Sequence, residues 1–357
     1  MNAIPHHNVQ RDVNPFVDQF GRHKRKLRIS VTDRCNFKCV YCMPEHPEWM
    51  KKQDLLSFEA LYQFCEFMVR RGIEHIRITG GEPLMRQGVV HFIAELQQLK
   101  KIGLKKVSMT TNAHYLKQYA SQLKQAGLDD LNISLDSLDA EQFKHLTKKD
   151  LLPVLEGIQQ AKAVGLPIKI NTVLIRGVND DQILPLAHWS IQNNVMVRFI
   201  EFMPLDGDAH WSSAHVVTEQ DILRHLKQDF DVTIKQGQSS EPARTYFIHG
   251  FPIGIISTIS NSFCGTCDRL RLTAKGEFFN CLFATQGLDL KKHIQALMQK
   301  KAPAELKLNA VLTDYIWHKK QGFDAIQQEQ TTLKLSTLAA SANHAATRKI
   351  SMYMIGG

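Results

Sequence analysis

Three cysteines within eight residues carry the strongest chemical signal in this sequence. Cys35, Cys39 and Cys42 have C-x₃-C-x₂-C spacing and follow the apolar run from Leu27 to Thr32. Thiolates favour iron–sulfur clusters or zinc, but a structural zinc site takes four protein ligands. Three thiolates on one short loop suit a cubane [4Fe–4S] cluster, whose fourth iron is then open to a small molecule. The spacing therefore predicts a catalytic cluster on this loop.

A second group of cysteines lies near the other end of the chain. Cys264 and Cys267 form a C-x₂-C pair, and Cys281 follows them, so that there are again three cysteines rather than four. The seventh cysteine, Cys65, lies on the apolar side of a helical stretch, and we expect it to be a packed core thiol.

The composition restricts the class of protein. The chain has 357 residues, 43% of them hydrophobic, which is enough for one large domain with an appendage or for two domains. No apolar run approaches the roughly 18 residues that span a membrane, and the polar segment Met1–Gln10 is no secretory signal. We therefore expect a cytoplasmic protein without a membrane partner, whose thiols stay reduced rather than forming disulfides.

The net charge of +9 fits nucleic acid, an acidic membrane surface or an anionic small substrate. Part of this charge has a simpler explanation. We expect the basic runs His23–Lys26 and Lys100–Lys101 to be solvated surface, so charge alone does not select a partner.

Six β-like runs alternate with amphipathic helical stretches in the first part of the chain. We expect strands at Leu27–Thr32, His75–Thr79, Lys106–Thr111, Asp130–Leu135, Ile168–Leu174 and Val195–Phe202, and helices at Phe58–Arg71, Gly88–Lys101, Tyr115–Ala126, Leu152–Val164 and Asp181–Asn193. Strands joined by crossover helices form parallel βα units. Six strands are fewer than the eight of a full TIM barrel, so we predict an α/β fold with an open, partial (β/α)6 TIM-like barrel over residues 27–215. Residues 1–26 would form an N-terminal extension.

The pattern changes near Val216, where we expect a smaller C-terminal region over residues 216–357. A helix is predicted at Thr218–Gln228 and shorter strands at Thr245–His249, Ile253–Ser257 and Arg269–Thr273. We expect Gln236–Pro242 to be a turn or linker, and the tail from Phe323 to Lys349 to be polar and in part mobile. The second group of cysteines belongs to this region.

One face of each barrel strand is polar, although parallel strands covered by helices are usually apolar on both faces. Four of these faces carry a cation, namely Arg28, Arg77, Lys169 and Arg198. Because side chains alternate along a strand and the helices need the apolar faces, the polar faces must line the barrel interior. Burying four unpartnered cations is costly, so they either meet water or bind a multiply charged anion. We expect a wide lumen that holds a phosphate-bearing substrate.

The segment Thr79-Gly80-Gly81-Glu82-Pro83 supports this interpretation. Glycines at the end of a strand let the backbone approach a ligand closely, and sites in such barrels lie at the carboxyl ends of the strands. The first cysteine loop also follows a strand, so we expect the two loops to share one rim of the barrel.

The C-x₃-C-x₂-C motif with Tyr41 before its last cysteine, followed by Gly-Gly-Glu-Pro, resembles the radical S-adenosylmethionine (SAM) superfamily. From about Phe16 to the end, the chain resembles the GTP 3′,8-cyclase family of molybdenum cofactor biosynthesis more closely. The segments that carry this resemblance are Phe20–Arg22, Leu27–Phe37, Tyr41–Pro44, Arg77–Leu84, Asn132–Asp136, Phe263–Leu272 with Cys281, and Gly356–Gly357. The sequence departs from the family at Ala113, where the family often has glycine after Thr-Thr-Asn.

The resemblance implies a radical SAM lyase that carries out the first step of molybdenum cofactor (molybdopterin) biosynthesis. A 5′-deoxyadenosyl radical, generated from SAM at the first cluster, would take hydrogen from ribose C3′ of GTP. The carbon radical would then attack guanine C8, and reduction of the resulting radical through the second cluster would give 3′,8-cyclo-7,8-dihydro-GTP. The open iron of the second cluster would bind the guanine end of GTP, and no side chain is expected to act as catalytic acid or base.

The same resemblance assigns residues to these ligands. The two [4Fe–4S] clusters would be held by Cys35, Cys39 and Cys42 and by Cys264, Cys267 and Cys281. SAM would contact Tyr41, Gly81, Ser134 and Met203, and GTP would contact Arg28, Arg77, Thr110, Lys169, Arg269 and Arg271. Arg198, Gly356 and Gly357 are further candidates.

The implied partners are GTP, an electron donor and a cyclic pyranopterin monophosphate synthase that takes the product onward; a homodimer is one possible assembly. Two alternatives stay open. One is another radical SAM enzyme with an auxiliary cluster that acts on a different nucleotide or a peptide. The other is a zinc-bearing nucleic-acid binder, which the basic charge suggests. The incomplete cysteine groups and the aromatic content of 8% disfavour this binder, and we expect no nucleic-acid partner.

Overall fold

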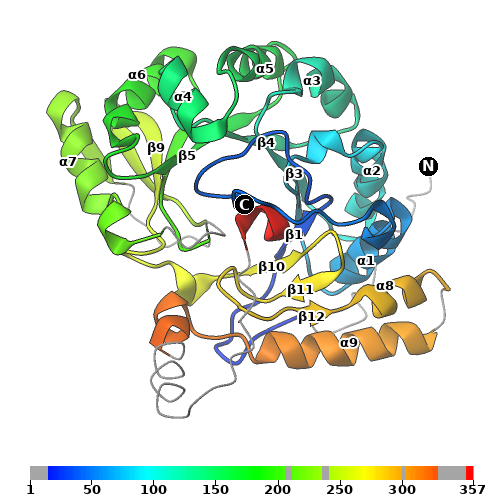
Figure 1. The fold of residues 1–357 in the computed structure, drawn as a ribbon. Helices are drawn as coiled ribbons and strands as arrows, with labels where there is room; N and C mark the ends of the chain where they lie inside the picture. The colour runs from blue at the N-terminus through cyan, green and yellow to red at the C-terminus, as the bar shows by residue number, and fades with distance from the viewer. Residues whose placement is uncertain (1–14, 206–210, 235–240, 300–301, 329–350, 357) are drawn as a thin grey trace, which may run out of the picture.

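The structure, a computed structural model, describes residues 15–205, 211–234, 241–299, 302–328 and 351–356. Six parallel strands form the centre of its sheet: β1 (Lys26–Ser30), β2 (His75–Thr79), β3 (Lys106–Thr111), β4 (Asp130–Ser134), β5 (Ile168–Leu174) and β6 (Val197–Glu201). They pair in chain order. Figure 1 shows them curving around a central space, with the helices outside. The predicted partial barrel is confirmed, and each strand lies within two residues of its predicted bounds.

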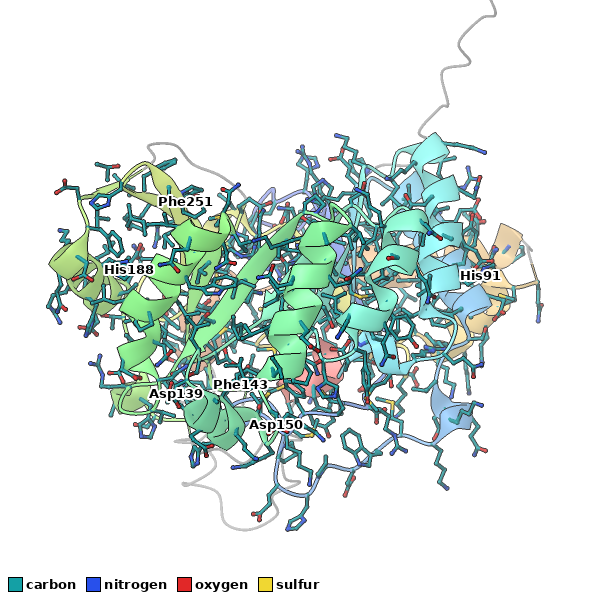
Figure 2. The ribbon with its side chains drawn as sticks, turned by 90° about the horizontal axis from the view of Figure 1, so that it is seen from above. His91, Asp139, Phe143, Asp150, His188 and Phe251 are labelled. Carbon is teal, nitrogen blue, oxygen red and sulfur yellow. The ribbon has the colours of Figure 1, made fainter. Side chains whose placement is uncertain are left out.

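The helices cover the outer face of this sheet because the strands present their apolar residues there. They are α1 (Phe58–Arg70), α2 (Val89–Leu96), α3 (Leu116–Gln125), α4 (Ala140–Thr147), α5 (Leu152–Ala163) and α6 (Ile183–Asn193). Leu27, Ile29, Ile76 and Ile78 are fully buried, and burying each such side chain contributes about 1.5–3 kcal/mol. Figure 2 shows the outer helices side by side, with Phe143 labelled on α4. The sequence analysis did not predict α4.

Strands of the C-terminal region extend both edges of the barrel sheet. β10 (Arg269–Leu272) pairs in parallel with β1, and β9 (Phe251–Ile256) pairs in parallel with β6. The sheet continues in antiparallel fashion through β11 (Glu277–Phe279) and β12 (Leu288–Asp289) at one edge, and through β8 (Arg244–Ile248) and β7 (Val232–Ile234) at the other. The parallel part of the barrel therefore has two more strands than the six that were predicted.

The remaining helices are α7 (Glu219–Asp229), α8 (Lys291–Leu297), α9 (Ala302–Trp317) and α11 (Met352–Ile355). Short 3-10 turns lie at Lys52–Asp54, Pro83–Met85, Gln97–Ile102, Asp180–Gln182, Ser213–His215 and Cys264–Thr266. The helix predicted near Thr218 is confirmed, and a capping box between Thr218 and Asp221 explains where it begins. No described helix has the length and apolar character needed to cross a membrane.

The prediction for the tail is wrong where the structure describes it. Residues 323–328 are helical, and Phe323 and Ile326 are buried, because two apolar side chains at i and i+3 share one helix face. Residues 329–349 of the predicted tail and 236–240 of the predicted linker lie outside the described residues.

Strand register brings the polar faces together inside the barrel. Arg28 of β1 lies opposite Arg77 of β2 on one side and Arg271 of β10 on the other. Further along the sheet Asn132 lies opposite Lys169, and Asn171 opposite Arg198. The prediction that the polar strand faces point the same way is confirmed. Figure 1 shows α11, coloured red, within the ring of strands near β1.

The departure from the family pattern at Ala113 has a visible consequence. Ala113 follows β3 with φ of 62°, in the left-handed region that glycine adopts more easily. The turn is nevertheless held, because Ala113 N donates to Thr111 Oγ1 at 3.1 Å. The chain thus keeps the turn without the glycine.

Candidate active site

The first cysteine loop follows β1 and lines a cavity of about 200 Å³ in the barrel. Cys35, Cys39 and Cys42 all face this cavity. Their thiols are the soft donors that iron–sulfur clusters use, so the residues present fit a cluster. Within the described residues, no three His, Cys, Asp or Glu side chains are close enough to hold one metal ion. A cubane does not need that proximity, because each thiolate binds a different iron.

Helix α4 holds this loop in place. Lys38 N and Val40 N donate hydrogen bonds to carbonyl oxygens in the last turn of α4, both at 3.1 Å. The rings of Phe37 and Phe143 pack edge to face with centroids 6.1 Å apart. The helix that the sequence analysis missed therefore positions the loop that it identified first.

The glycine loop after β2 packs directly on the backbone of the cysteine loop. Gly81 N donates to Thr32 O at 2.7 Å, and Glu82 N donates to Arg34 O at 2.8 Å. A Cβ atom on Gly81 would overlap the backbone carbonyl of Arg34. Since Arg34 directly precedes the first cysteine, the prediction that the two loops share one rim is confirmed, and glycine is required there for close approach.

We expect Gly81→Ala to disturb the first cysteine loop, because the added methyl group meets backbone that cannot rotate away. SAM affinity should fall by at least about tenfold, corresponding to about 1.4 kcal/mol. Equilibrium binding of SAM to anaerobically reconstituted protein measures this change. Gly265→Ala is the matched control, since Gly265 lies in the second cysteine segment and a Cβ there meets nothing within 4 Å. Equal SAM affinity in the two variants would contradict the role of Gly81.

The predicted SAM contacts Tyr41, Gly81, Ser134 and Met203 all line the first cavity. The Tyr41 hydroxyl donates to Asp136 Oδ2 at 2.6 Å, and Asp136 Oδ1 accepts from Val173 N at 2.9 Å. Burial raises the pKa of Asp136 to about 6. The sequence analysis did not name Asp136 as a site residue, although its i+2 spacing from Ser134 puts both side chains on one face.

The first three thiols are buried, and two carboxylates act on them. Burial, with Glu82 as the next cause, raises the pKa of Cys35 to about 12. Burial and Asp136 likewise raise the pKa values of Cys39 and Cys42. Thiolates at these positions need a bound metal to compensate their charge, since it is the deprotonated form that binds metals.

The second cysteine group lines its own cavity, next to the first. Cys264, Cys267 and Cys281 face this second cavity, as do Arg269 and Lys319. The side chains that line both cavities are Thr258, Phe263, Arg271 and Leu282. The two groups of cysteines therefore face adjoining cavities that share these four side chains.

Here the surroundings are basic. Although burial raises the pKa of Cys267, Arg269 and Lys319 lower it to about 5. Arg269 Nη2 donates to Cys267 Sγ at 3.4 Å. This group also offers three thiols to one cavity, and it fits a second cluster.

The structure places the predicted GTP contacts in two sets. Arg28, Thr110 and Arg271 line the first cavity, and Arg269 and Arg271 line the second. Arg77, Lys169 and Arg198 line neither cavity and lie on β2, β5 and β6. Arg77 Nε donates to Ser108 Oγ at 3.1 Å, and Arg198 donates to Asn132 Oδ1.

Arg28 lies among other cations. Burial lowers its pKa, and Arg271, Arg77 and Arg269 lower it further by repulsion. Among the described residues, no carboxylate pairs with Arg28. Asp130 and Glu241 offset part of the charge on Arg77, but the concentration of cations around Arg28 still suits a multiply charged anion.

The C-terminal tail enters the same space. Arg271 Nη1 donates to Ile355 O at 3.4 Å and also to Gly356 O. Gly356 has φ of 72°, and a Cβ atom there would overlap the side chain of Thr79. Gly357, the last predicted candidate, lies outside the described residues.

The expectation that His23–Lys26 is solvated surface is wrong for Lys24. Its side chain is 1% exposed. Lys24 Nζ donates to Asp18 Oδ2 at 2.6 Å and to Cys267 O at 3.0 Å. A run of basic residues carries no signal that one member is buried, because the burial depends on Asp18 and on a segment more than 200 residues away.

Comparison with known proteins identifies the family of this chain. The family model of the radical SAM superfamily matches residues 29–190, and that of Molybdenum Cofactor Synthesis C matches residues 195–325. A GTP 3′,8-cyclase from Streptomyces coelicolor is 40% identical over 86% of this chain and 90% of its own. One from Staphylococcus carnosus is 38% identical over 80% and 86%.

A solved structure gives independent support for the fold. SuiB from Streptococcus suis, bound to S-adenosylmethionine, superposes with a TM-score of 0.59 over 80% of this chain and 67% of its own, at 13% identity. At that identity the likeness concerns the fold alone, whereas the two cyclases share sequence over nearly their whole length. The chain therefore belongs to the GTP 3′,8-cyclase family of the radical SAM superfamily.

Proposed function

We propose that this protein is a radical SAM lyase that converts GTP to 3′,8-cyclo-7,8-dihydro-GTP, the first step of molybdenum cofactor biosynthesis. One observation carries the proposal: Arg271 lines both of the cysteine-lined cavities, and other cations of the barrel strands act on the same region. The cyclases at 38–40% identity support the choice of reaction. We expect the reaction to take place in the cytoplasm.

Each cysteine group would hold one [4Fe–4S] cluster. Cys35, Cys39 and Cys42 would hold the first, and Cys264, Cys267 and Cys281 the second. When bound, the first cluster and SAM supply the 5′-deoxyadenosyl radical. Tyr41, Gly81, Ser134 and Met203 would position SAM, since all four line the cavity of the first group.

The cations would bind the triphosphate of GTP. Arg28, Arg269 and Arg271 repel one another in the free protein, so binding a polyanion removes this repulsion and adds charge-assisted hydrogen bonds. Lys169 and Arg198 extend the positive charge along β5 and β6, and Arg77 extends it along β2. We expect GTP affinity to fall as salt rises, because counterions screen these charges.

The position of the two cavities suggests how the chain promotes the reaction. A nucleotide that reaches from the SAM end to the second cysteine group would have its ribose between them, near Thr110. Holding the reacting atoms in contact lowers the barrier to reaction, because a bimolecular encounter becomes an effectively unimolecular step. Apolar side chains such as Val173, Ile200 and Phe202 line the first cavity and would keep water from the reacting atoms. An electron donor and a cyclic pyranopterin monophosphate synthase would act before and after this enzyme.

The test is 5′-deoxyadenosine formation by anaerobically reconstituted protein with SAM and a strong reductant, comparing GTP, ATP and no nucleotide. A burst that depends on GTP is the expected result, with the cyclised nucleotide identified by mass spectrometry. Formation of 5′-deoxyadenosine without nucleotide preference would keep radical SAM chemistry and contradict the cyclase. No formation by iron-loaded protein would contradict both.

A further inference from the structure

Three buried cations contact the backbone of the second cysteine group. Each of them donates a hydrogen bond to a different carbonyl oxygen. The bonds are Arg22 Nη1 to Cys264 O at 2.8 Å, Lys24 Nζ to Cys267 O at 3.0 Å, and Lys319 Nζ to the carbonyl oxygen of Asn280, the residue before Cys281. The cations come from the N-terminal segment and from the end of α9, so two distant parts of the chain converge on this group.

These cations are neutralised only in part. Arg22, Lys24 and Lys319 are 7%, 1% and 2% exposed, and Asp18, at 1%, accepts from Arg22 Nε and Lys24 Nζ, both at 2.6 Å. We call these four residues the basic cradle. Within the part of the chain that the structure describes, Asp18 is the one carboxylate paired with these cations, and it contacts Arg22 and Lys24, which leaves a buried excess of positive charge. Such an excess is costly unless an anion accompanies it, and the thiolates of the second group are the nearest anions.

Two buried carboxylates act on the first cysteine group, Glu82 at 0% exposure and Asp136 at 2%. The cations Arg28 and Arg271 line the same cavity, so this group has buried charges of both signs around it. Reduction of a [4Fe–4S] cluster adds one electron and therefore one negative charge. Nearby cations favour that change and nearby carboxylates oppose it.

We propose that the basic cradle raises the reduction potential of the second cluster, so that Asp18, Arg22, Lys24 and Lys319 are positioning residues that set where an electron resides. The inference rests on the second cluster of the proposed function. The step is the transfer of one electron from a low-potential one-electron donor to the oxidised cluster, with no proton taken up and no bond broken. Because Lys24 and Asp18 carry opposite charges, neutral replacements of these two residues must shift the reduction potential of the second cluster in opposite directions.

The experiment is a potential titration of the full-length, anaerobically reconstituted protein with dithionite, monitored by electron paramagnetic resonance. The signal of the second cluster is identified by its loss in Cys281→Ser. In Lys24→Met, the ratio of reduced to oxidised second cluster at the wild-type midpoint should fall about tenfold, which is 59 mV for one electron. In Asp18→Asn, the same ratio should rise. The first cluster should keep its midpoint in both variants.

Lys105→Met is the matched control, because Lys105 pairs with Glu74 at the surface with 62% of its side chain exposed, and it should shift neither midpoint. Shifts of the same sign in Lys24→Met and Asp18→Asn, or no shift in either, would overturn the inference. Should Lys24→Met lose the cluster, Lys319→Met gives the second measurement, and cluster loss in both would show a purely structural role and equally overturn it. Wild-type protein whose iron content accounts for one cluster only would instead overturn the second cluster of the proposed function.

Discussion

Replacement of Cys39 by serine is expected to reduce 5′-deoxyadenosine formation to background. Cys39 faces the first cavity between Cys35 and Cys42, and its carbonyl oxygen accepts from Cys42 N at 3.0 Å. A hydroxyl is a poor substitute for a soft thiolate ligand, so one iron would lose its anchor. The measurement is 5′-deoxyadenosine per chain by chromatography after anaerobic reconstitution with SAM, GTP and a strong reductant.

Cys65→Ala is the control for this loss. Cys65 lies on the buried face of α1 and is fully buried in the hydrophobic core, as its position on the apolar side of a helical stretch predicted. Removing its sulfur should cost some stability but leave SAM cleavage intact. The role assigned to Cys39 would be refuted by a Cys39→Ser variant that retains cleavage at the rate of Cys65→Ala.

Replacement of Arg271 by alanine should weaken GTP binding about a hundredfold while SAM cleavage remains possible. Arg271 is 5% exposed, lines both cavities and donates to the backbone of the C-terminal tail. Burial, and then Arg269, lowers its pKa to about 9, so the side chain is still charged at neutral pH. A hundredfold loss corresponds to about 2.7 kcal/mol, within the range for hydrogen bonds to charged groups.

Anaerobic calorimetry of GTP binding measures this effect, with iron content confirming that both cysteine groups remain loaded. Arg70→Ala is a suitable control, because Arg70 lies on the surface of α1 with half of its side chain exposed and pairs with Glu66. Unchanged GTP affinity in Arg271→Ala would remove Arg271 from the substrate site. An equal loss in both variants would point to bulk charge rather than to a specific contact.

Local patterns predicted much of this protein. Several signals are properties of short segments, namely the strand and helix periods, the cysteine spacing and the Gly-Gly pair. Each indicates a type of local structure or site without reference to distant residues. The barrel strands and the shared rim of the two loops followed from such patterns. Even the polar lumen did, because period-two alternation in Arg28, Ser30 and Thr32 already shows which face needs a polar environment.

Other features depend on contacts between distant segments. Helix α4 is only 8 residues long, and its importance lies in the carbonyl groups that it offers to the cysteine loop. In the sequence, β9 and β10 resemble ordinary short strands. Their pairing with β6 and β1 in the structure is what places them in the barrel. The basic run around Lys24 predicts a surface position, because nothing beside Lys24 in the chain identifies Asp18 as its partner.

The ligand types, their spacing and the excess of positive charge inside a parallel barrel can all be inferred from the amino-acid sequence. How that charge is divided between the two cysteine groups depends on the folded structure. It put Glu82 and Asp136 beside the first cysteine group, and Lys24 and Lys319 beside the second. The physical reason is that electrostatic interactions act over a few ångströms in space regardless of chain separation, whereas patterns report only on neighbours along the chain.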